Sequence, residues 1–245
     1  MCSIINKLKQ AAGSDNIPLE LLKDGGRTLK QKLHKLILMI WNNEQLPQQW
    51  NEGIICPVYK KGDRLNCNNY RPIILLNIAY KIFAVLLNKR LLENKENKLE
   101  DNQMGLRSNT STIDNIFIIR QIFEKSHEYN IDLYNIFVDY THAFDSFYRS
   151  KLIECLKKFD APDKLIRLTA LTLIQIRAPV KIKRDLTEEF IVGCGVKQGD
   201  PLSATLFSLG IDTILKQMGL RGNITTRLKQ CTAYGDDIML RTRTK

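Results

Sequence analysis

Two adjacent aspartates, Asp236 and Asp237, lie between two short apolar runs near the end of the sequence. Residues 231–234 and 238–240 are expected to form the arms of a β-hairpin, with Gly235 near the turn because glycine tolerates positive φ. Two carboxylates at a hairpin tip cannot both ionise cheaply without a cation. The pair is therefore a candidate site for Mg²⁺, which prefers oxygen ligands, and a plain polar turn is the alternative.

A third carboxylate, Asp139, comes at the far end of an apolar and aromatic run over residues 133–140. This run is expected to be a strand. If it neighbours the hairpin in one sheet, Asp139, Asp236 and Asp237 meet at one edge. Two metal ions held about 3.5–4 Å apart by such carboxylates can activate an attacking oxygen and stabilise a leaving oxygen. The cluster therefore indicates phosphoryl or nucleotidyl transfer, although it would suit a metal-dependent phosphatase or nuclease equally well.

A basic stretch between Lys60 and Arg71 could hold a triphosphate. Lys60, Lys61 and Arg64 are expected on a turn that follows a strand over residues 53–59, and Arg71 comes shortly after them. Arginine is favoured for phosphate because its planar guanidinium makes two parallel hydrogen bonds. Solvated surface charge is the alternative for all of these cations.

Two other residues could contact a nucleotide. Phe144 follows Asp139 closely, and its ring could exclude a ribose 2′-hydroxyl by bulk, whereas a core aromatic would look the same in sequence. Gln198 lies between Gly195 and Gly199, which let the backbone approach a ligand closely. The carboxamide of Gln198 could hydrogen-bond a sugar or a base. A simple strand-to-helix connection is the alternative for this segment.

These residues need a scaffold, and the apolar pattern predicts both helices and strands. Apolar residues at spacings of three and four indicate helices, and β-branched runs bounded by turn residues indicate strands. Helices are expected over residues 29–40, 78–92 (capped by Asn77), 112–125, 150–159, 164–176 and 200–218 (opened by Asp200 and Pro201). Strands are expected over residues 53–59, 133–140, 178–182 paired with 188–192, and in the hairpin near the end. This order predicts the α+β class, an antiparallel sheet backed by helices on one face.

The charge of the chain indicates a polyanionic partner. The 245 residues include 37 Lys and Arg against 26 Asp and Glu, which gives a formal net charge of +11. A surplus of this size favours nucleic acid as the partner. An ordinary basic protein is the alternative.

The cysteines and the N-terminus indicate the cellular compartment in which the protein is expected. The six cysteines form no C-x-x-C pair and only three histidines are present, which argues against a zinc site and against a disulfide framework. The N-terminal residues lack the apolar core of a signal peptide. The most apolar stretch, residues 73–87, is too short to span a bilayer. We expect an intracellular protein of the cytoplasm or nucleus, neither secreted nor bound to a membrane.

Six segments resemble the reverse transcriptase of non-LTR (LINE-like) retrotransposons. They are residues 11–23, the NYRP block at 69–83, residues 103–114, FVDYTHAFD at 137–145, QGDPLS within 198–207, and YGDD at 234–237. A single such string is a weak signal, but six in the family's order are specific. They extend over nearly the whole chain. Departures from the family's pattern, such as Ala12, Leu106 and Ala204, remove no candidate carboxylate.

The resemblance implies a right-hand polymerase, with a fingers-like region over residues 1–128 and a palm over residues 129–245 that contains a ferredoxin-like sheet. It also implies two Mg²⁺ ions, with Mn²⁺ as a substitute. An RNA template, a DNA primer and dNTPs are the partners that it implies. By the same resemblance, the catalytic metal ligands are Asp139, Asp236 and Asp237. The residues that contact the nucleotide are Lys61 and Arg71 at the triphosphate, Phe144 as the gate for the sugar, and Gln198, which seats the nucleotide. Local structure is braced by Asp114, Asp145 and Asp200.

The expected function is RNA-directed DNA synthesis by two-metal nucleotidyl transfer. The family's thumb is absent from the matched segments, so we expect a fragment or a decayed copy whose own activity stays open. One alternative is a catalytically inactive remnant that only binds nucleic acid. Another is a metal-dependent phosphoesterase on a related sheet, against which the segments around Arg71 and Gln198 argue.

Overall fold

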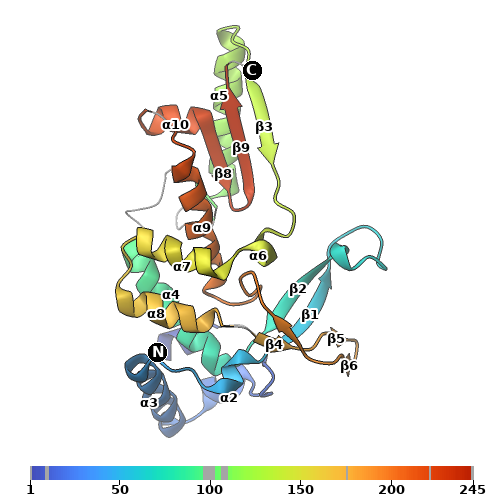
Figure 1. Cartoon of the computed structure of the whole chain (residues 1–245), viewed down its shortest axis with the longest axis vertical. Coiled ribbons are helices and arrows are strands. Elements are labelled where there is room, and N and C mark those ends of the chain that lie inside the picture. Colours follow the sequence, from blue (N-terminus) through green and yellow to red (C-terminus); the bar gives the residue numbers. More distant parts are fainter. Residues whose placement is uncertain are drawn as a thin grey trace. The chain divides into compact units, whose positions relative to one another are not determined.

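The computed structural model describes residues 2–8, 11–95, 103–105, 110–174, 176–220 and 222–243. The chain divides into two compact units, each made from two stretches of sequence. Unit 1 comprises Met1–Asn94 and Phe144–Ser203, and unit 2 comprises Lys95–Ala143 and Ala204–Lys245. Both units combine helices with short antiparallel strands (Figure 1), which confirms the predicted α+β class. The division into fingers and palm at residue 128 stays a prediction.

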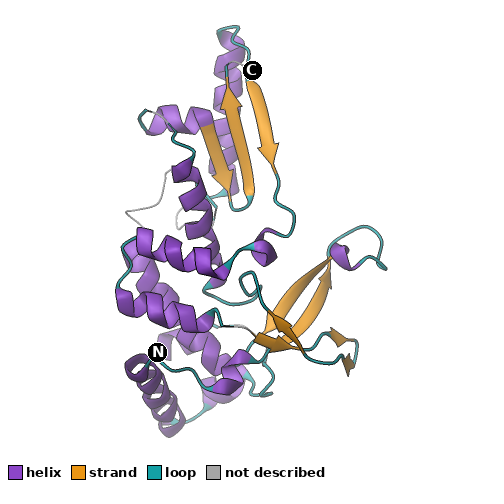
Figure 2. Cartoon of the chain, viewed as in Figure 1, coloured by secondary structure: helices purple, strands orange, loops and turns teal. Residues whose placement is uncertain are grey.

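Unit 1 is mainly helical, and its strands form small hairpins and ladders (Figure 2). Its helices are α1 (Cys2–Lys7), α2 (Leu19–Asp24), α3 (Arg27–Asn43), α4 (Ile78–Lys95), α7 (Arg149–Lys158) and α8 (Asp163–Thr172), with the short α6 (Ala143–Ser146) at its boundary and the 3-10 helices η1 (Gln48–Asn51) and η2 (Cys67–Asn69). Its strands are β1 (Ile54–Tyr59), β2 (Tyr70–Leu75), β4 (Ile176–Ala178), β5 (Lys181–Ile182), β6 (Asp185–Leu186) and β7 (Phe190–Val192).

The core of unit 1 is built around α4. Tyr80 and Phe83 on this helix are almost completely buried, and the Trp50 ring packs on both, with centroids 5.8 Å from Tyr80 and 6.0 Å from Phe83. Residues 80–84 are buried in succession, so the helix is enclosed on more than one face. This confirms the helix predicted over residues 78–92.

Asn77 acts differently from the predicted helix cap. The helix begins at Ile78, but the Asn77 side chain accepts hydrogen bonds from Ser14 Oγ (3.1 Å) and from the Asp15 amide (3.3 Å). It also donates to the carbonyl of Gln49 (3.2 Å). Asn77 therefore ties distant segments of unit 1 together instead of capping α4 through its side chain.

β1 and β2 form an antiparallel hairpin in which Val58 pairs with Arg71. β1 confirms the strand predicted over residues 53–59. No strand is predicted from the sequence at β2, because Pro72 interrupts the run and has no amide to donate to a ladder. Arg71 therefore lies within a strand, beyond the turn on which Lys60, Lys61 and Arg64 are expected.

The predicted pairing of residues 178–182 with 188–192 is wrong in detail. Two shorter ladders replace it, in which β4 pairs with β7 and β5 pairs with β6. The helix predicted over residues 164–176 ends at Thr172, and the last predicted residue, Ile176, instead begins β4. The cause is a distant partner, since the Gly53 amide beside β1 donates to the carbonyl of Arg177 in β4 (3.0 Å).

Unit 2 contains a three-stranded antiparallel sheet in the order β3-β9-β8, with β9 in the centre (Figure 1). Its strands are β3 (Tyr134–Val138), β8 (Cys231–Tyr234) and β9 (Asp237–Thr242), and its helices are α5 (Thr112–Glu128), α9 (Ser203–Gln217) and α10 (Ile224–Gln230). Helix α5 packs against β8, and α10 packs against β8 and β9. The predicted hairpin near the end of the chain is confirmed, and α9 starts later than predicted.

α5 begins with a capping box, in which Ser111 Oγ accepts from the Asp114 amide and the Asp114 carboxylate accepts from the Ser111 amide. Asp114 thus braces local structure, as expected. The apolar face predicted for this helix stays exposed, since Ile113 is 74% and Phe117 is 61% accessible. α5, like every helix within the described ranges, is too short or too polar to cross a membrane.

Candidate active site

The register of the sheet in unit 2 brings the three aspartates to one end. Val138 of β3 pairs with Ile238 of β9 as the last pair of the ladder, so Asp139 follows β3 at the end of the sheet where Asp237 begins β9, and its charge acts on Asp237. Tyr234 at the end of β8 also pairs with Asp237, and Asp236 lies in the turn between these strands. The predicted neighbourhood of the two strand ends is therefore confirmed.

The turn that carries Asp236 is held by a buried glutamine. Gly235 has φ +66°, as a tight turn requires. Gln103, which has no solvent exposure, accepts hydrogen bonds through Oε1 from the Gly235 amide (3.2 Å) and the Gly105 amide (3.0 Å), and donates through Nε2 to the Gly235 carbonyl (3.2 Å). A Cβ on Gly105 would lie 1.9 Å from the Gly235 nitrogen. Sequence reasoning assigns no role to Gln103, although it falls inside a family-like segment.

The carboxylates influence one another. Burial raises the pKa of Asp237, and the charges of Asp236 and Asp139 raise it further. Asp236 is half-buried, whereas the other two are exposed. An all-oxygen donor set of this kind suits Mg²⁺. Among the residues that the structure describes, no three Asp, Glu, His or Cys side chains are gathered around a single point as a metal site, so the aspartates share an edge without closing around an ion.

Phe144 and Gln198 are brought together in unit 1. The Val196 amide donates to the Phe144 carbonyl (2.8 Å), and Gln198 Nε2 donates to both carboxylate oxygens of Asp145 (2.9 Å each). The Gln198 carbonyl accepts from the Ile74 amide of β2 (2.7 Å). The segment with Gln198 is thus anchored to β2 and to the segment that follows Ala143, and Asp145 braces it, as expected.

Arg149 clamps the same segment, and sequence reasoning did not single it out. Its guanidinium donates to the carbonyls of Gly195 (2.8 Å), Val192 (3.0 Å) and Cys194 (3.1 Å). Burial lowers the pKa of Arg149. The planar guanidinium has several donors in a fixed arrangement, so it can bind several carbonyls at once. The spacing of residues in the sequence does not reveal this role of Arg149, because the acceptors are backbone groups.

Asp200 lies in a buried polar network. The Tyr80 hydroxyl donates to Asp200, and the Leu202 amide donates to the same carboxylate (2.9 Å). Lys197 Nζ lies 4.8 Å from the centroid of the Tyr80 ring, and burial lowers the pKa of Lys197 to about 8. Burial and the Asp200 charge raise the pKa of Tyr80 well above its usual value. Asp200 therefore braces the segment, as expected, although helix α9 begins only at Ser203.

Lys61 and Arg71 lie on the β1–β2 hairpin and are both exposed. The loop with Lys61 folds on itself, since the Tyr59 hydroxyl donates to the Gly62 carbonyl (2.6 Å) and the Arg64 guanidinium lies 5.3 Å from the Tyr59 ring centroid. These contacts leave the cations directed to solvent, where an anionic ligand can reach them.

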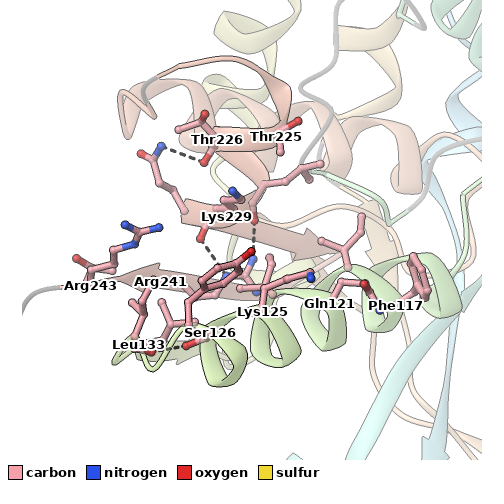
Figure 3. Close-up of a pocket in the computed structure, with 17 residues that line it drawn as sticks. Phe117, Gln121, Lys125, Ser126, Leu133, Thr225, Thr226, Lys229, Arg241 and Arg243 are labelled. Carbon is pink, nitrogen blue, oxygen red and sulfur yellow. Dashed lines mark hydrogen bonds between the residues drawn. The ribbon is translucent and has the colours of Figure 1, made fainter.

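Unit 2 also has a pocket of about 740 Å³, which lies away from the three aspartates (Figure 3). It is lined by α5, α10, the last residues of β9 and Arg243 just after that strand, whereas Asp237 begins β9. Arg241 in its wall already donates to the carbonyls of Leu228 (2.7 Å) and Lys229 (3.2 Å). The pocket is therefore separate from the aspartate edge.

Comparisons with known proteins agree with the motifs. The family described as "Reverse transcriptase (RNA-dependent DNA polymerase)" matches residues 58–245. The "Transposon TX1 uncharacterized 149 kDa protein" of Xenopus laevis is 27% identical over 94% of this chain and 18% of its own length. The "Retrovirus-related Pol polyprotein from type-2 retrotransposable element R2DM" of Drosophila melanogaster is 26% identical over 97% of this chain and 22% of its own length. The chain thus spans about a fifth of these relatives.

A solved structure supports the fold. The apo telomerase of Candida tropicalis, truncated from its C-terminal domain, has a TM-score of 0.58 and 15% identity. The match covers 97% of this chain and 52% of that chain. At this identity the likeness concerns the fold alone, and it confirms the predicted α+β fold of a polymerase with fingers and palm. The resemblance to non-LTR retrotransposon proteins is confirmed by the sequence relatives.

Proposed function

The chain belongs to the reverse transcriptase (RNA-dependent DNA polymerase) family, and we propose that it carries the nucleotidyl-transfer centre for RNA-directed DNA synthesis. The observation that supports this proposal best is the meeting of Asp139, Asp236 and Asp237 at one end of the β3-β9-β8 sheet. The reaction joins the α-phosphate of a dNTP to the 3′-oxygen of a primer and releases pyrophosphate.

Divalent metal ions are general to this family, and the aspartates are the residues that would hold them here. Asp139 and Asp236 are the main ligands in this proposal and Asp237 is the third, with two Mg²⁺ ions as the expected occupants and Mn²⁺ as a substitute. Bound ions would supply charge neutralisation at the reacting phosphate. The chain's own contribution is position, because Gln103 holds the turn that carries Asp236.

The nucleotide contacts are assigned to residues of unit 1. Lys61 and Arg71 bind the triphosphate, and their exposure on the β1–β2 hairpin supports this role. Phe144 is half-buried and limits the space for a sugar 2′-hydroxyl. Gln198 seats the nucleotide from a segment that backbone and side-chain hydrogen bonds hold in place.

The partners in this proposal are an RNA template, a DNA primer and dNTPs. The formal net charge of +11 supports polyanionic partners of this kind. We place the protein inside the cell, in the cytoplasm or nucleus, because Cys67 and Cys194 are exposed thiols, which suits a reducing compartment.

Primer extension tests the proposal. A DNA primer annealed to an RNA template is incubated with dNTPs and Mg²⁺, using the chain joined to a family thumb so that the primer–template is gripped. Asp236→Asn should abolish primer extension. The control is Asp185→Asn, which removes an exposed carboxylate on β6 and should leave extension unchanged. Extension that survives Asp236→Asn would refute the catalytic role of the aspartates.

A second candidate is a remnant that only binds nucleic acid. The formal net charge of +11 favours it. Salt-sensitive RNA binding that persists in Asp139→Asn and Asp236→Asn, without extension by the wild type, would support this candidate. Phosphate-ester hydrolysis without templated synthesis would instead favour a phosphoesterase.

A further inference from the structure

The pocket of unit 2 is an elongated groove that runs along helix α5. Its wall on this side contains residues at intervals of four: Phe117, Gln121, Lys125 and the C-cap residue Tyr129. Residues at this spacing follow one another along one face of a helix. At a rise of about 1.5 Å per residue, the row from Phe117 to Tyr129 is about 18 Å long. Figure 3 shows α5 on one side of this groove, here called the α5 groove, and β9 with α10 on the other.

The α5 groove is apolar and open at both ends. Phe117 and Tyr129 line its two ends and are 61% and 65% exposed. Ile118, Ile122 and Leu228 line it as well and are half-buried. A closed cavity would surround a small molecule on most sides, whereas an open apolar groove of this length fits a peptide segment that runs through it.

Helix α5 has apolar surface to bury. None of its 17 residues is buried, although its sequence is rich in isoleucine and phenylalanine. An amphipathic helix commonly binds by laying its apolar face into a groove of this kind, with contacts repeated every three or four residues. The row of residues on α5 has the same repeat, so a helix laid beside it can match its ridges.

The charges of the α5 groove indicate the polar side of such a helix. Lys125, Lys229 and Arg243 line the groove, and none of the described residues that line it is Asp or Glu. Lys125 is paired with Glu128 on its own helix (2.5 Å). Over the described part of the chain, no carboxylate forms an ion pair with Lys229 or Arg243. These two cations come from α10 and from the end of β9, so acidic residues would be attracted to that side of the groove.

A second copy of this chain fits the α5 groove poorly. Its formal net charge of +11 would bring more positive charge to a groove that is already cationic. We propose that the α5 groove binds an amphipathic helix of a partner protein, with the apolar residues of that helix against α5 and its acidic residues facing Lys229 and Arg243. This inference does not depend on the proposed function, because the groove lies away from the three aspartates.

Two designed peptides test the proposal on the chain itself. Both are fluorescein-labelled helices of about 15 residues with the same row of leucines at intervals of three and four. One has glutamates beside this row and the other has lysines at the same positions. In fluorescence anisotropy at low salt, the acidic peptide should bind at least about tenfold more tightly, and the difference should shrink at about 0.5 M salt through screening. Equal affinities at low salt would overturn the inference.

Charge reversal locates the binding site. Arg243→Glu and Lys229→Glu change exposed side chains, and each should raise Kd for the acidic peptide about three- to tenfold while tightening the binding of the basic peptide. The matched control is Lys158→Glu, at an exposed position on α7 in unit 1, which should leave both affinities near those of the wild type. A loss in Lys158→Glu as large as in Arg243→Glu would show that only the net charge matters, and would overturn the site.

Phe117→Ser separates apolar docking from charge. It removes an exposed ring at one end of the groove and should weaken both peptides in similar proportion, without changing the ratio of their affinities. An unchanged affinity would contradict docking against α5. Circular dichroism should show that the acidic peptide gains helicity when it binds, and binding without helicity would overturn the helical occupant.

Competition and self-association test the other occupants. A single-stranded RNA that displaces the acidic peptide and is itself bound less tightly by Phe117→Ser would make the α5 groove a nucleic-acid site and overturn the proposal. So would a dimer in sedimentation experiments that Phe117→Ser dissociates, if the wild type then binds neither peptide. The proposal predicts a monomer in which RNA and the acidic peptide bind independently at the groove.

Failure of this inference is distinguishable from failure of the proposed function. Peptide binding is measured without a primer, a template or dNTPs, so its outcome does not depend on catalysis. Asp236→Asn, which should abolish primer extension, should leave the affinity for the acidic peptide unchanged. A loss of peptide binding in this variant would contradict the separation of the groove from the aspartates.

Discussion

Val138 and Ile238 are the last pair between β3 and β9, and this pairing brings Asp139 to the end of the sheet where Asp237 begins β9. The two aspartates come from distant parts of the sequence, and a shift of one residue in this register would turn the side chains of β3 to the other face of the sheet. The register is therefore the structural basis for treating the aspartates as a single site.

Gln103 should be essential to the geometry of the turn. Gln103→Ala removes the buried partner of the Gly235 and Gly105 amides and should lower the free energy of unfolding by about 2–3 kcal/mol. Urea denaturation measures the change. Gln31→Ala, at an exposed position on α3, should have little effect. Equal stability of the two variants would show that the turn does not depend on Gln103.

Arg149→Lys should destabilise the segment that carries Gln198. Lysine keeps the charge but loses the planar fork that reaches three carbonyls, so we expect a loss of about 1–3 kcal/mol. Arg167→Lys is the matched control, because Arg167 pairs with Glu44 at the surface and such pairs contribute less than about 1 kcal/mol. A smaller effect at Arg149 than at Arg167 would contradict the clamp.

Lys197 should leave a signature in the pH dependence of stability. Its folded-state pKa of about 8 lies below the value near 10.5 of an unfolded lysine, so between these values the unfolded chain binds more protons. The free energy of unfolding should therefore rise as the pH increases from 8, by about 1.4 kcal/mol for each unit of pKa difference that is crossed. Above pH 10 the Tyr80 hydroxyl, whose pKa is raised, acts in the opposite direction.

Denaturation at pH 7.5 and 9.5 gives the measurement. Lys197→Met should flatten the rise, whereas Lys158→Met, at an exposed position on α7, should retain it. The buried Lys81, whose pKa burial also lowers, contributes to the slope in all three proteins and cancels in the comparison. An unchanged slope in Lys197→Met would show that Lys197 is not the source.

Phe144→Ala should relax the choice of sugar. Removing the ring opens space beside the proposed nucleotide position, so incorporation of ribonucleotides relative to dNTPs should increase on the order of ten- to a hundredfold. Competition between rNTP and dNTP on one RNA template measures the ratio. The control is Tyr148→Ala, at an exposed position. Phe159→Ala would be unsuitable, because Phe159 is a buried core residue. A ratio that stays at the wild-type level would remove Phe144 from the sugar site.

Elements with a strong local signal could be predicted from the sequence. The hairpin of β8 and β9 combines an apolar run with a glycine at the turn, and the structure has β8 at the predicted residues. Elements that depend on distant partners could not be predicted. β4 replaces the end of a predicted helix because it pairs with β7 and accepts from Gly53.

The same distinction holds for the candidate site. The aspartates could be identified from the sequence because each lies at the end of a strand-like run. Their meeting could be predicted only on the condition that the two strands are neighbours in one sheet. Gln103, Arg149 and Tyr80 are not visible in this way. Their partners are backbone amides and carbonyls or a buried carboxylate, which no residue spacing reveals.

The role of Asp139 offers the most direct test, because it alone of the three aspartates comes from another part of the chain. Extension of a DNA primer on an RNA template with Mg²⁺ is measured for the thumb-joined chain, its Asp139→Asn variant and its Asp185→Asn control. The account predicts extension by the wild type and the control and none by Asp139→Asn. Extension by Asp139→Asn at the wild-type rate would contradict it.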